Sequence, residues 1–487
     1  MPASFVPSAT DYLRFLPEII MIAIGTLIML LEPLLGGNKK NSLSGLTVLG
    51  FIAALVAAVM ANGMPGTSFS NMLIVDGFAT FFRVLVIGVG ILTVLSSAQY
   101  LKREHAASAE YYALLLFSVT GQCVMATANE LIMIFIGLEI SSIATYILAG
   151  YLRDDKRNNE AALKYFLLGS FATAFLLYGI AWIYGTTGTT NLMDIRAYLM
   201  TPGVHRNLLA GTAAALMFVG FAFKVSAAPF QVWAPDVYQG APAPVTLFMS
   251  AGPKAAAFAV FLRVFMTAFE PISPRWEPFV WSSALLTMVI GNFAALSQTN
   301  IKRLLAYSSI AHAGYVMVAI ASHSQIGVAA AMFYLAAYAL MNIGAFAVIT
   351  HFSRQGEKFL EVEDLAGLGW KQPVTAALFC IFLLSLIGVP LTGGFFGKFY
   401  IFKAALDANL IWLSVLGLLN SAVAAYYYLR IIVVMYMHEP GESTVTLQPL
   451  GAGITATLWA AALGTLILGI FPSLILNFAT SSSVLAK

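Results

Sequence analysis

The sequence predicts an all-α polytopic membrane protein with about fourteen transmembrane helices. Of the 487 residues, 60% are hydrophobic and only 10% are charged, and the mean hydropathy is +0.85. A soluble domain is about 45–50% apolar and about 25% charged, so a soluble chain of this length could not cover its surface with so few charges. The apolar runs are also continuous rather than alternating, which excludes a transmembrane β-barrel.

The expected membrane spans are runs of about 20 mostly apolar residues. In order along the chain they cover 15–35, 44–62, 77–99, 111–128, 131–151, 161–184, 208–229, 243–269, 279–298, 302–321, 327–352, 373–404, 410–436 and 452–475. The seventh is expected to be discontinuous at Pro229 and the twelfth at Pro390, because proline removes a backbone donor and strains the turn before it.

Basic residues in the loops predict the orientation of the spans. Loops after odd-numbered spans hold thirteen Lys and Arg residues, and loops after even-numbered spans hold three. The first group is Lys39, Lys40, Lys102, Arg103, Arg153, Lys156, Arg157, Lys164, Lys302, Arg303, Arg354, Lys358 and Lys371, and the second is Arg196, Arg206 and Arg275. Because cytoplasmic loops are rich in Lys and Arg, the odd loops are expected in the cytoplasm and both termini outside.

A faint internal repeat predicts the domain organisation. Glu139-Ile-Ser-Ser-Ile-Ala144 resembles Ala306-Tyr-Ser-Ser-Ile-Ala311, 167 positions later, and Lys224 precedes Lys398 by 174 positions. Two units of five spans explain both offsets, and because five is odd the second unit must be inverted across the membrane. The expected parts are an N-terminal three-helix segment (1–107), a first five-helix repeat (108–270), a second, inverted repeat (276–438) and a C-terminal helix (450–487).

Five ionisable residues inside the expected spans form the candidate functional site: Glu139, Lys224, Lys254, His312 and Lys398. An ionisable group in the bilayer core costs at least a few kcal/mol, so it persists where it faces protein, water or a partner. Each of the three lysines lies beside a helix breaker, where freed carbonyls must be satisfied by protein or water. A single snorkelling lysine would be ordinary, but three in this setting favour a proton path.

Glu139 lies about two turns inside its span, and the sequence allows two interpretations of it. It is either a structural glutamate that orients helices or half of an intramembrane pair with a lysine. A carboxylate favours the charged form of a nearby lysine, whereas desolvation favours the neutral form. Moving one partner of such a pair would therefore change the proton affinity of the other, which is what a proton pump requires.

His312 also has two interpretations. His312 can exchange protons near neutral pH, or it is a core histidine bonded to a neighbouring hydroxyl such as Ser308 or Ser309. Arg83 and Arg263 are expected toward helix ends, each with a local partner.

Several classes of site are excluded. The formal net charge is only +3, without a basic tract, so a nucleic-acid partner is not expected. The two cysteines, Cys123 and Cys380, are too few for an iron–sulfur cluster, and a disulfide between membrane spans is not expected. No Gly-rich nucleotide-binding fingerprint is present, so a nucleotide site is not expected. No metal-binding residue and no cofactor are assigned to this chain.

The residues around Lys224 carry a resemblance to a known family. The stretch 224–244, followed by Lys254, resembles the proton-translocating antiporter-like subunits of respiratory complex I, and 298–312 and 393–400 match further motifs of that family. The Pro-Asp-Val-Tyr-Gln-Gly-Ala-Pro segment within the first stretch is similar to the N type of these subunits. The absence of a long C-terminal extension argues against the L type, and Lys398 in place of a glutamate argues against the M type.

The resemblance implies a role for each candidate residue. Glu139 corresponds to the fifth-span glutamate and Lys224 to its paired lysine. Lys254 corresponds to the connecting lysine of the eighth span, His312 to the tenth-span histidine, and Lys398 to the twelfth-span lysine that faces the outer exit. The family fold, fourteen helices with two inverted five-helix units, agrees with the repeat read from the residues.

The resemblance also implies a function and partners. The chain would be a membrane subunit of NADH-quinone oxidoreductase in the bacterial inner membrane, and it would couple electron transfer from NADH to quinone to proton transport. FMN, the iron–sulfur clusters and quinone would belong to partner subunits. The expected neighbours are M- and K-type membrane subunits, the peripheral redox arm and the lipid bilayer.

Two alternatives stay open at this point. A cation/proton antiporter subunit of the Mrp type, or a membrane subunit of a hydrogenase, shares the fold and the buried lysines. A structural membrane scaffold that holds a redox arm is the second alternative, although a scaffold gains little from the insertion cost of buried charges.

Overall fold

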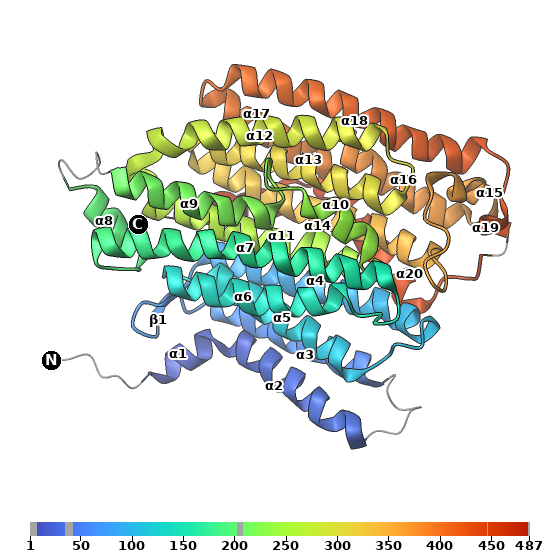
Figure 1. Ribbon diagram of the computed structural model, residues 1–487, viewed down its shortest axis with the longest axis horizontal. Coiled ribbons are helices and arrows are strands. Elements are labelled where there is room, and N and C mark those ends of the chain that lie inside the picture. Colours follow the sequence, from blue (N-terminus) through green and yellow to red (C-terminus); the bar gives the residue numbers. More distant parts are fainter. Residues whose placement is uncertain (1–6, 35–41, 202–207, 446, 486–487) are drawn as a thin grey trace.

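The computed structural model describes residues 7–34, 42–201, 208–445 and 447–485. Within these residues the chain is almost entirely helical, and most of the helices run side by side in one bundle (Figure 1). Twelve of the described helices are long and apolar enough to cross a membrane, so the chain is a multi-pass membrane protein. Lys39, Lys40 and Arg206, which contribute to the loop charges, lie outside the described residues.

The N-terminal segment contains three long helices and one hairpin. Its elements are α1 (Ala9–Arg14), α2 (Leu16–Leu31) with the single turn Glu32–Leu34, α3 (Ser42–Ala61), β1 (Gly66–Ser68), β2 (Leu73–Val75) and α4 (Gly77–Arg103). The two strands pair antiparallel and are the exception to the predicted all-α class. Asp76, directly after β2, begins α4 because its carboxylate accepts a hydrogen bond from Ala79 N at 2.6 Å.

The next part of the chain is built around a discontinuous helix. Its elements are α5 (Ala109–Thr127), α6 (Leu131–Ala149), α7 (Lys156–Thr187), α8 (Leu192–Leu199), α9 (Leu208–Val225), α10 (Trp233–Gly240) and α11 (Ala243–Arg263), followed by the π-helical segment Val264–Ala268 and the short 3-10 helix Glu270–Ile272. The chain breaks between α9 and α10, at the predicted Pro229. By contrast, α11 continues across Pro253.

The third part contains a second discontinuous helix. Its elements are α12 (Ser273–Leu296), α13 (Ile301–Ala321), α14 (Gln325–Phe352), the turn Val362–Leu365, α15 (Leu368–Lys371), α16 (Pro373–Ile387), α17 (Gly393–Asp407) and α18 (Ile411–Met437). Gly388 ends α16 with a φ of 97°, a conformation that glycine adopts without strain. The chain closes with α19 (Glu442–Val445), α20 (Ala452–Ile470) and α21 (Ser473–Ser482).

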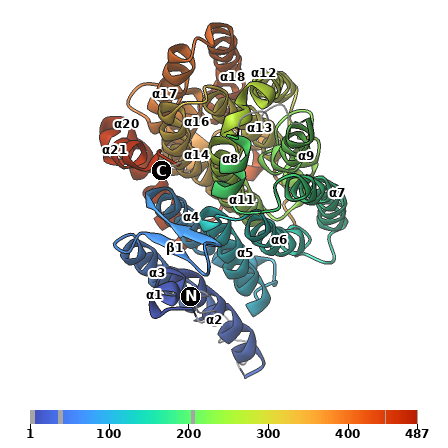
Figure 2. The same ribbon diagram turned by 90° about the vertical axis from the view of Figure 1, so that its left-hand side faces the viewer.

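The centre of the bundle is formed by α11, α13 and α14. In each, 94% of the residues in the most apolar eighteen-residue stretch are buried, against 28% in α2. Seen along the bundle, these helices lie between α4, α9 and α17 (Figure 2). Side chains on α11, α13 and α14 therefore face protein rather than lipid, which is where an ionisable group can be kept inside a membrane.

Candidate functional site

The predicted site residues lie on five helices of the bundle. Glu139 is in α6, Lys224 one residue before the end of α9, Lys254 in the middle of α11, His312 in α13 and Lys398 in the first turns of α17. Lys254, His312 and Lys398 are buried, with exposed fractions of 3%, 2% and 6%, whereas Glu139 and Lys224 are half-buried.

Glu139 and Lys224 do not form the direct ion pair that we predicted. Lys224 Nζ instead donates hydrogen bonds to Ser142 Oγ at 2.7 Å and Tyr146 OH at 3.0 Å, one and two turns beyond Glu139 on α6. Glu139 still interacts electrostatically with Lys224 and Tyr146, and its Oε1 is buried without a hydrogen-bond partner in the described residues. A change of charge on the Glu139 carboxylate would therefore act on the Lys224 ammonium group through its electric field or through the hydroxyls of Ser142 and Tyr146.

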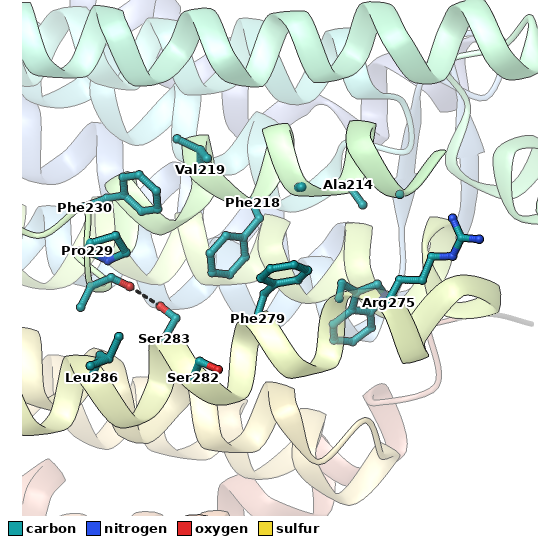
Figure 3. Close-up of a pocket in the computed structure, with 14 residues that line it drawn as sticks. Ala214, Phe218, Val219, Pro229, Phe230, Arg275, Phe279, Ser282, Ser283 and Leu286 are labelled. Carbon is teal, nitrogen blue, oxygen red and sulfur yellow. Dashed lines mark hydrogen bonds between the residues drawn. The ribbon is translucent and has the colours of Figure 1, made fainter. Parts of the chain in front are cut away.

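The break after Lys224 is held by α12. Ala228 N donates to Thr287 Oγ1 at 2.7 Å, and Ser283 Oγ donates to Ala228 O at 2.5 Å. These hydrogen bonds give partners to a backbone N–H and a backbone C=O that have none within a helix. Inside a bilayer such groups must be satisfied by protein, because no lipid group can bond to them. Beside the break lies an apolar groove of about 350 Å³ between α9 and α12, into which Phe218, Pro229 and Phe279 project (Figure 3).

A row of aromatic rings connects Lys224 with α11. Lys224 Nζ lies 5.9 Å from the centre of the Tyr165 ring, and that ring stacks on Trp233 at 4.5 Å. Trp233 contacts Tyr238 with ring centres 6.1 Å apart. Tyr238 OH donates to Met249 O at 3.4 Å, the carbonyl that Pro253 leaves without its usual backbone donor.

Sequence reasoning did not select Tyr238 as a functional residue. The signal was present, because Tyr238 lies inside the motif at 235–242 and four residues before Pro242. Its hydroxyl interacts with Tyr165, with Ser309 and with Tyr338. Tyr238 thus lies between the surroundings of Lys224 and those of Lys254.

Lys254 is bonded only to neutral groups. Its Nζ donates to Ser309 O at 2.9 Å and to Ser309 Oγ, both on α13. Tyr338 OH donates to Ser309 Oγ at 2.7 Å, and Asn342 Nδ2 donates to Tyr338 OH at 3.0 Å. No carboxylate of the described residues forms an ion pair with this ammonium group.

His312 is enclosed by tyrosines rather than by the serines considered in the alternative interpretation, which was wrong about the partners. Its Nδ1 is bonded to Tyr334 OH and its Nε2 lies 3.2 Å from Tyr428 OH. Ser308 is bonded to Tyr428, not to the imidazole. The imidazole ring centre is also 5.3 Å from that of Tyr338, the residue bonded beside Lys254.

Lys398 is held by the end of α16. Its Nζ donates to Leu386 O at 2.9 Å, Ile387 O at 2.8 Å and Ser421 Oγ at 2.8 Å. The last carbonyls of a helix lack backbone donors and carry partial negative charge, so the break in the predicted twelfth span creates the acceptor for this lysine. Lys398 Nζ lies 4.8 Å from the Tyr315 ring centre, and that ring contacts His312 at 5.5 Å.

A further buried lysine escaped the sequence analysis, which counted Lys302 as a loop cation. Lys302 is fully buried and donates to Glu357 Oε2 at 2.8 Å. Glu357 Oε1 accepts from Tyr100 OH at 2.8 Å and from Ala243 N at 2.6 Å, the first residue of α11. The acidic residue that completes this ion pair lies 55 positions away, so no local pattern indicated it.

The two buried arginines also have distant partners, which corrects the expectation of local ones. Arg83 forms a two-pronged ion pair with Glu18, with both N–O distances at 2.9 Å. Arg263 contacts both carboxylate oxygens of Asp76, at 2.9 and 3.0 Å. Each arginine thus joins two helices far apart in the chain, because only an opposite charge compensates a buried guanidinium.

The described residues contain no group of three or more His, Cys, Asp or Glu side chains that could hold a metal ion. Cys123 and Cys380 are both free thiols.

The structure defines a multi-pass membrane protein with two discontinuous helices and protonatable side chains inside its helix bundle. The sequence matches the family model of the NADH:quinone oxidoreductase/Mrp antiporter transmembrane proteins over residues 128–424. It is also 63% identical to NADH-quinone oxidoreductase subunit N 1 of Solibacter usitatus, over 100% of both chains. This chain belongs to the subunit N family of NADH-quinone oxidoreductases.

Solved structures agree with this assignment. A chain of respiratory complex I from Thermus thermophilus with bound aureothin is 35% identical, with a TM-score of 0.82 over 95% of this chain and 99% of that chain. A chain of the Mrp complex from Dietzia is 20% identical, with a TM-score of 0.85 over 98% of this chain and 97% of that chain. The second likeness concerns the fold alone.

Proposed function

We propose that this chain is a proton-translocating membrane subunit of NADH-quinone oxidoreductase. Electron transfer from NADH to quinone would occur in partner subunits, which would also hold FMN and the iron–sulfur clusters. The full-length likeness to subunit N of Solibacter usitatus supports this function. The likeness to the Mrp chain is at 20% identity, so the alternative antiporter function has weaker support.

The observation that carries the proposal is a set of three lysines inside the bundle, two buried and one half-buried, that are all bonded to neutral groups. Lys254 and Lys398 bond to hydroxyls and carbonyls, and Lys224 to two hydroxyls. A buried lysine with a carboxylate partner is held in its charged form, whereas desolvation without such a partner allows a neutral form. Each of these lysines can therefore alternate between the two forms, as a proton carrier must.

The contacts suggest an order of transfer. A change imposed near Glu139 would alter the proton affinity of Lys224 through Tyr146 and Ser142. The proton would pass by Tyr238 to Lys254, whose bonding partner Ser309 also accepts a hydrogen bond from Tyr338. A hydroxyl can accept one proton while it donates another.

The last part of the proposed route runs through His312. Its two ring nitrogens bond to Tyr334 and Tyr428, so the imidazole can take a proton on one side and release it on the other. Tyr315 lies between the imidazole and Lys398, the last carrier before the outer side. Glu139, Lys224, Lys254, His312 and Lys398 are thus the proposed translocating residues.

The proposed topology has fourteen spans in two inverted units. To the twelve candidate spans we add α5 and the discontinuous pair α16 and α17. The packing supports a repeat, since α5 packs on α6 and α7 on α9 in one half, as α12 packs on α13 and α14 on α17 in the other. For the parts of the chain we keep the proposal made from the sequence, 1–107, 108–270, 276–438 and 450–487. We propose the bacterial inner membrane as location, with both termini outside.

A surface beside Glu139 supports contact with a neighbouring membrane subunit, for which M- and K-type subunits are our candidates. The exposed residues of α6 are isoleucines at helical spacing: Ile132, Ile136, Ile140, Ile143 and Ile147. This face is apolar and its residues lie next to the half-buried carboxylate in sequence and on the helix. A neighbour packed there would be well placed to act on Glu139.

The test is proton pumping by the whole complex in sealed membranes after Lys224→Ala, with assembly measured in parallel. We expect normal assembly, because the hydroxyl partners of Lys224 remain satisfied by each other or by backbone. We also expect fewer protons pumped per electron, because the protons that this subunit carries would be lost. Lys371→Ala, at an exposed lysine on α15, is the control and should leave pumping unchanged. Normal pumping in the assembled Lys224 variant would favour the scaffold function instead.

A further inference from the structure

A hollow of about 730 Å³ lies where three membrane helices meet at one end of the bundle. It is lined by the last residues of α4, by the residues that end and follow α14, and by Leu447 and Gln448, which precede α20. Because α4, α14 and α20 are all candidate spans, the hollow lies at the level where helices leave the membrane. This end is the one that the loop charges place in the cytoplasm.

The lining of the hollow is basic and contains no acidic residue. Its residues are Gln99, Lys102, Arg103, His105, His351, Arg354, Gln355, Lys358, Phe359, Leu447 and Gln448. Four of the eleven are lysines or arginines and two are histidines. An adjacent hollow at the same end is mixed, because Glu160 and Asp236 there face Arg157, Lys164 and Arg303.

The two arginines of the basic hollow are fixed in its wall. Arg103 donates to Ser353 Oγ at 3.2 Å and has Glu104 at 3.5 Å, outside the lining. Arg354 donates to Ser443 O at 2.5 Å and lies 4.8 Å over the Phe359 ring. Their charge is thus oriented by the fold and not by a ligand.

The two lysines are different. The side chains of Lys102 and Lys358 are exposed, and among the described residues neither ammonium group has a hydrogen-bond or ion-pair partner. They come from elements 256 positions apart and face one cavity. Two uncompensated ammonium groups above a pair of fixed guanidinium groups make a site of strong positive potential.

The geometry points to a binding site for the phosphate group of an anionic phospholipid. Lysine and arginine bind phosphate oxygens, and basic hollows between membrane helices on the cytoplasmic side suit anionic headgroups. The apolar walls Phe359 and Leu447 fit the glycerol end of such a lipid. The helix that begins after Gln448, α20, also carries the exposed residues Trp459, Leu463 and Ile467 at helical spacing, an apolar face that acyl chains can contact.

The site also borders the buried pair described above. The segment between Arg354 and Phe359 contains Glu357, which contacts Lys302 and the first residue of α11. A lipid phosphate on Lys358 would therefore hold the segment that closes the end of the lysine-bearing helix α11. This consequence is separate from the proposed proton function, and binding can be measured whether or not the subunit pumps.

The test is photo-crosslinking of the assembled complex with a phosphatidylglycerol probe that carries its photoreactive group near the phosphate. The measured quantity is the yield on peptides that contain residues 99–105 and 351–359. Lys102→Gln with Lys358→Gln should lower this yield about thirtyfold, since each surface cation near an anionic headgroup contributes about 1 kcal/mol and every 1.4 kcal/mol is a factor of ten. Lys102→Arg with Lys358→Arg should keep it, which separates loss of charge from loss of folding.

Three controls make the result specific. Arg153→Gln with Lys156→Gln removes the same charge at the same end outside the hollow, and should leave the yield unchanged. A phosphatidylcholine probe should label these peptides weakly in every variant. Each of three results would overturn the proposal. The first is an unchanged yield in the double glutamine variant, and the second is that inorganic phosphate displaces the probe as effectively as phosphatidylglycerol does. The third is cross-linking of these peptides to an acidic segment of another subunit in place of the lipid.

Discussion

The N-terminal helices and the centre of the bundle both bury charged side chains, but they hold them differently. In the N-terminal segment, Arg83 and Glu18 form a closed pair with exposed fractions of 1% and 0% and two parallel hydrogen bonds. In the centre, Lys254 and Lys398 are equally removed from the surface and bond to hydroxyls and carbonyls.

We propose that this difference separates charges that stabilise the structure from charges that carry protons. In a closed pair each charge stabilises the other, so neither partner readily changes its protonation state. A lysine among neutral acceptors has no fixed counter-charge and can exist in both forms. Buried charge alone is therefore weak evidence for a proton path, and the nature of the partner is the useful criterion.

The largest expected effect is on transport, at a central lysine. Lys254→Met keeps the volume of the side chain, and Ser309 retains its hydrogen bond from Tyr338. We expect the assembled complex to lose the protons carried by this subunit while its stability changes little. Proton-to-electron ratios in sealed vesicles measure this, and a ratio equal to that of the unaltered complex would remove Lys254 from the path.

The next effect is on stability, at the closed pair. Arg83→Met leaves the Glu18 carboxylate buried without its partner, which costs about 3–5 kcal/mol. We expect a lower unfolding temperature and poor assembly, with a normal proton-to-electron ratio in the complexes that do form. The double variant Glu18→Leu with Arg83→Leu should recover most of the stability. If Arg83→Met instead lowered the ratio without destabilising the complex, the distinction between the two regions would fail.

A smaller effect on transport is expected at Tyr428, which contacts His312. Tyr428→Phe removes the hydroxyl bonded to His312 Nε2 and to Ser308, while Tyr334 remains on the other ring nitrogen. Proton transport by the assembled complex should slow several-fold without being abolished. Tyr427→Phe is the matched control, since Tyr427 OH donates to Asn292 at 3.0 Å and does not bond to the imidazole. Equal slowing in both variants would argue against a path through His312.

The smallest effect is expected at a charge pair outside the membrane. Asp155 begins α7 by accepting from Arg157 N at 2.8 Å, and Asp155→Ala should cost about 1 kcal/mol of stability, as for other helix caps. Hydrogen bonds from Arg157 lower the pKa of Asp155 below its usual value of 3.8. Its contribution is therefore complete above that value and is lost as the pH falls through the lower folded-state pKa. Thermal unfolding at pH 7 and at acidic pH measures the difference in stability between the variant and the unaltered protein. This difference should become smaller at acidic pH, and a larger difference there would contradict the prediction.

Local features of the sequence were enough to locate much of the fold. Each expected span contains a described helix or helix pair, because about 20 apolar residues are needed to satisfy a backbone inside a membrane. The breaks at Pro229 and beside Pro390 were predicted from the residues that cause them. The hairpin between α3 and α4 was not predicted, because strands of three residues carry too little periodicity.

The candidate site was predicted only as a set of residue types. The cost of burying an ionisable group singled out Glu139, the three lysines and His312 without any knowledge of their neighbours. The same reasoning missed Lys302, because a lysine at the expected edge of a span has the sequence pattern of a loop cation. It also missed Tyr238, whose importance depends on contacts with helices that precede and follow it.

The sequence by itself determined that this chain crosses the membrane many times and that particular charges lie within its spans, because hydropathy and helix breaking act over a few neighbouring residues. Only the tertiary structure decided which of those charges are closed into pairs and which are bonded to neutral groups. The partners of Arg83, Lys254 and Lys302 lie 65, 55 and 55 positions away. A hydrogen bond depends on distances of about 3 Å between side chains, and helix packing alone sets such distances between residues so far apart in the chain.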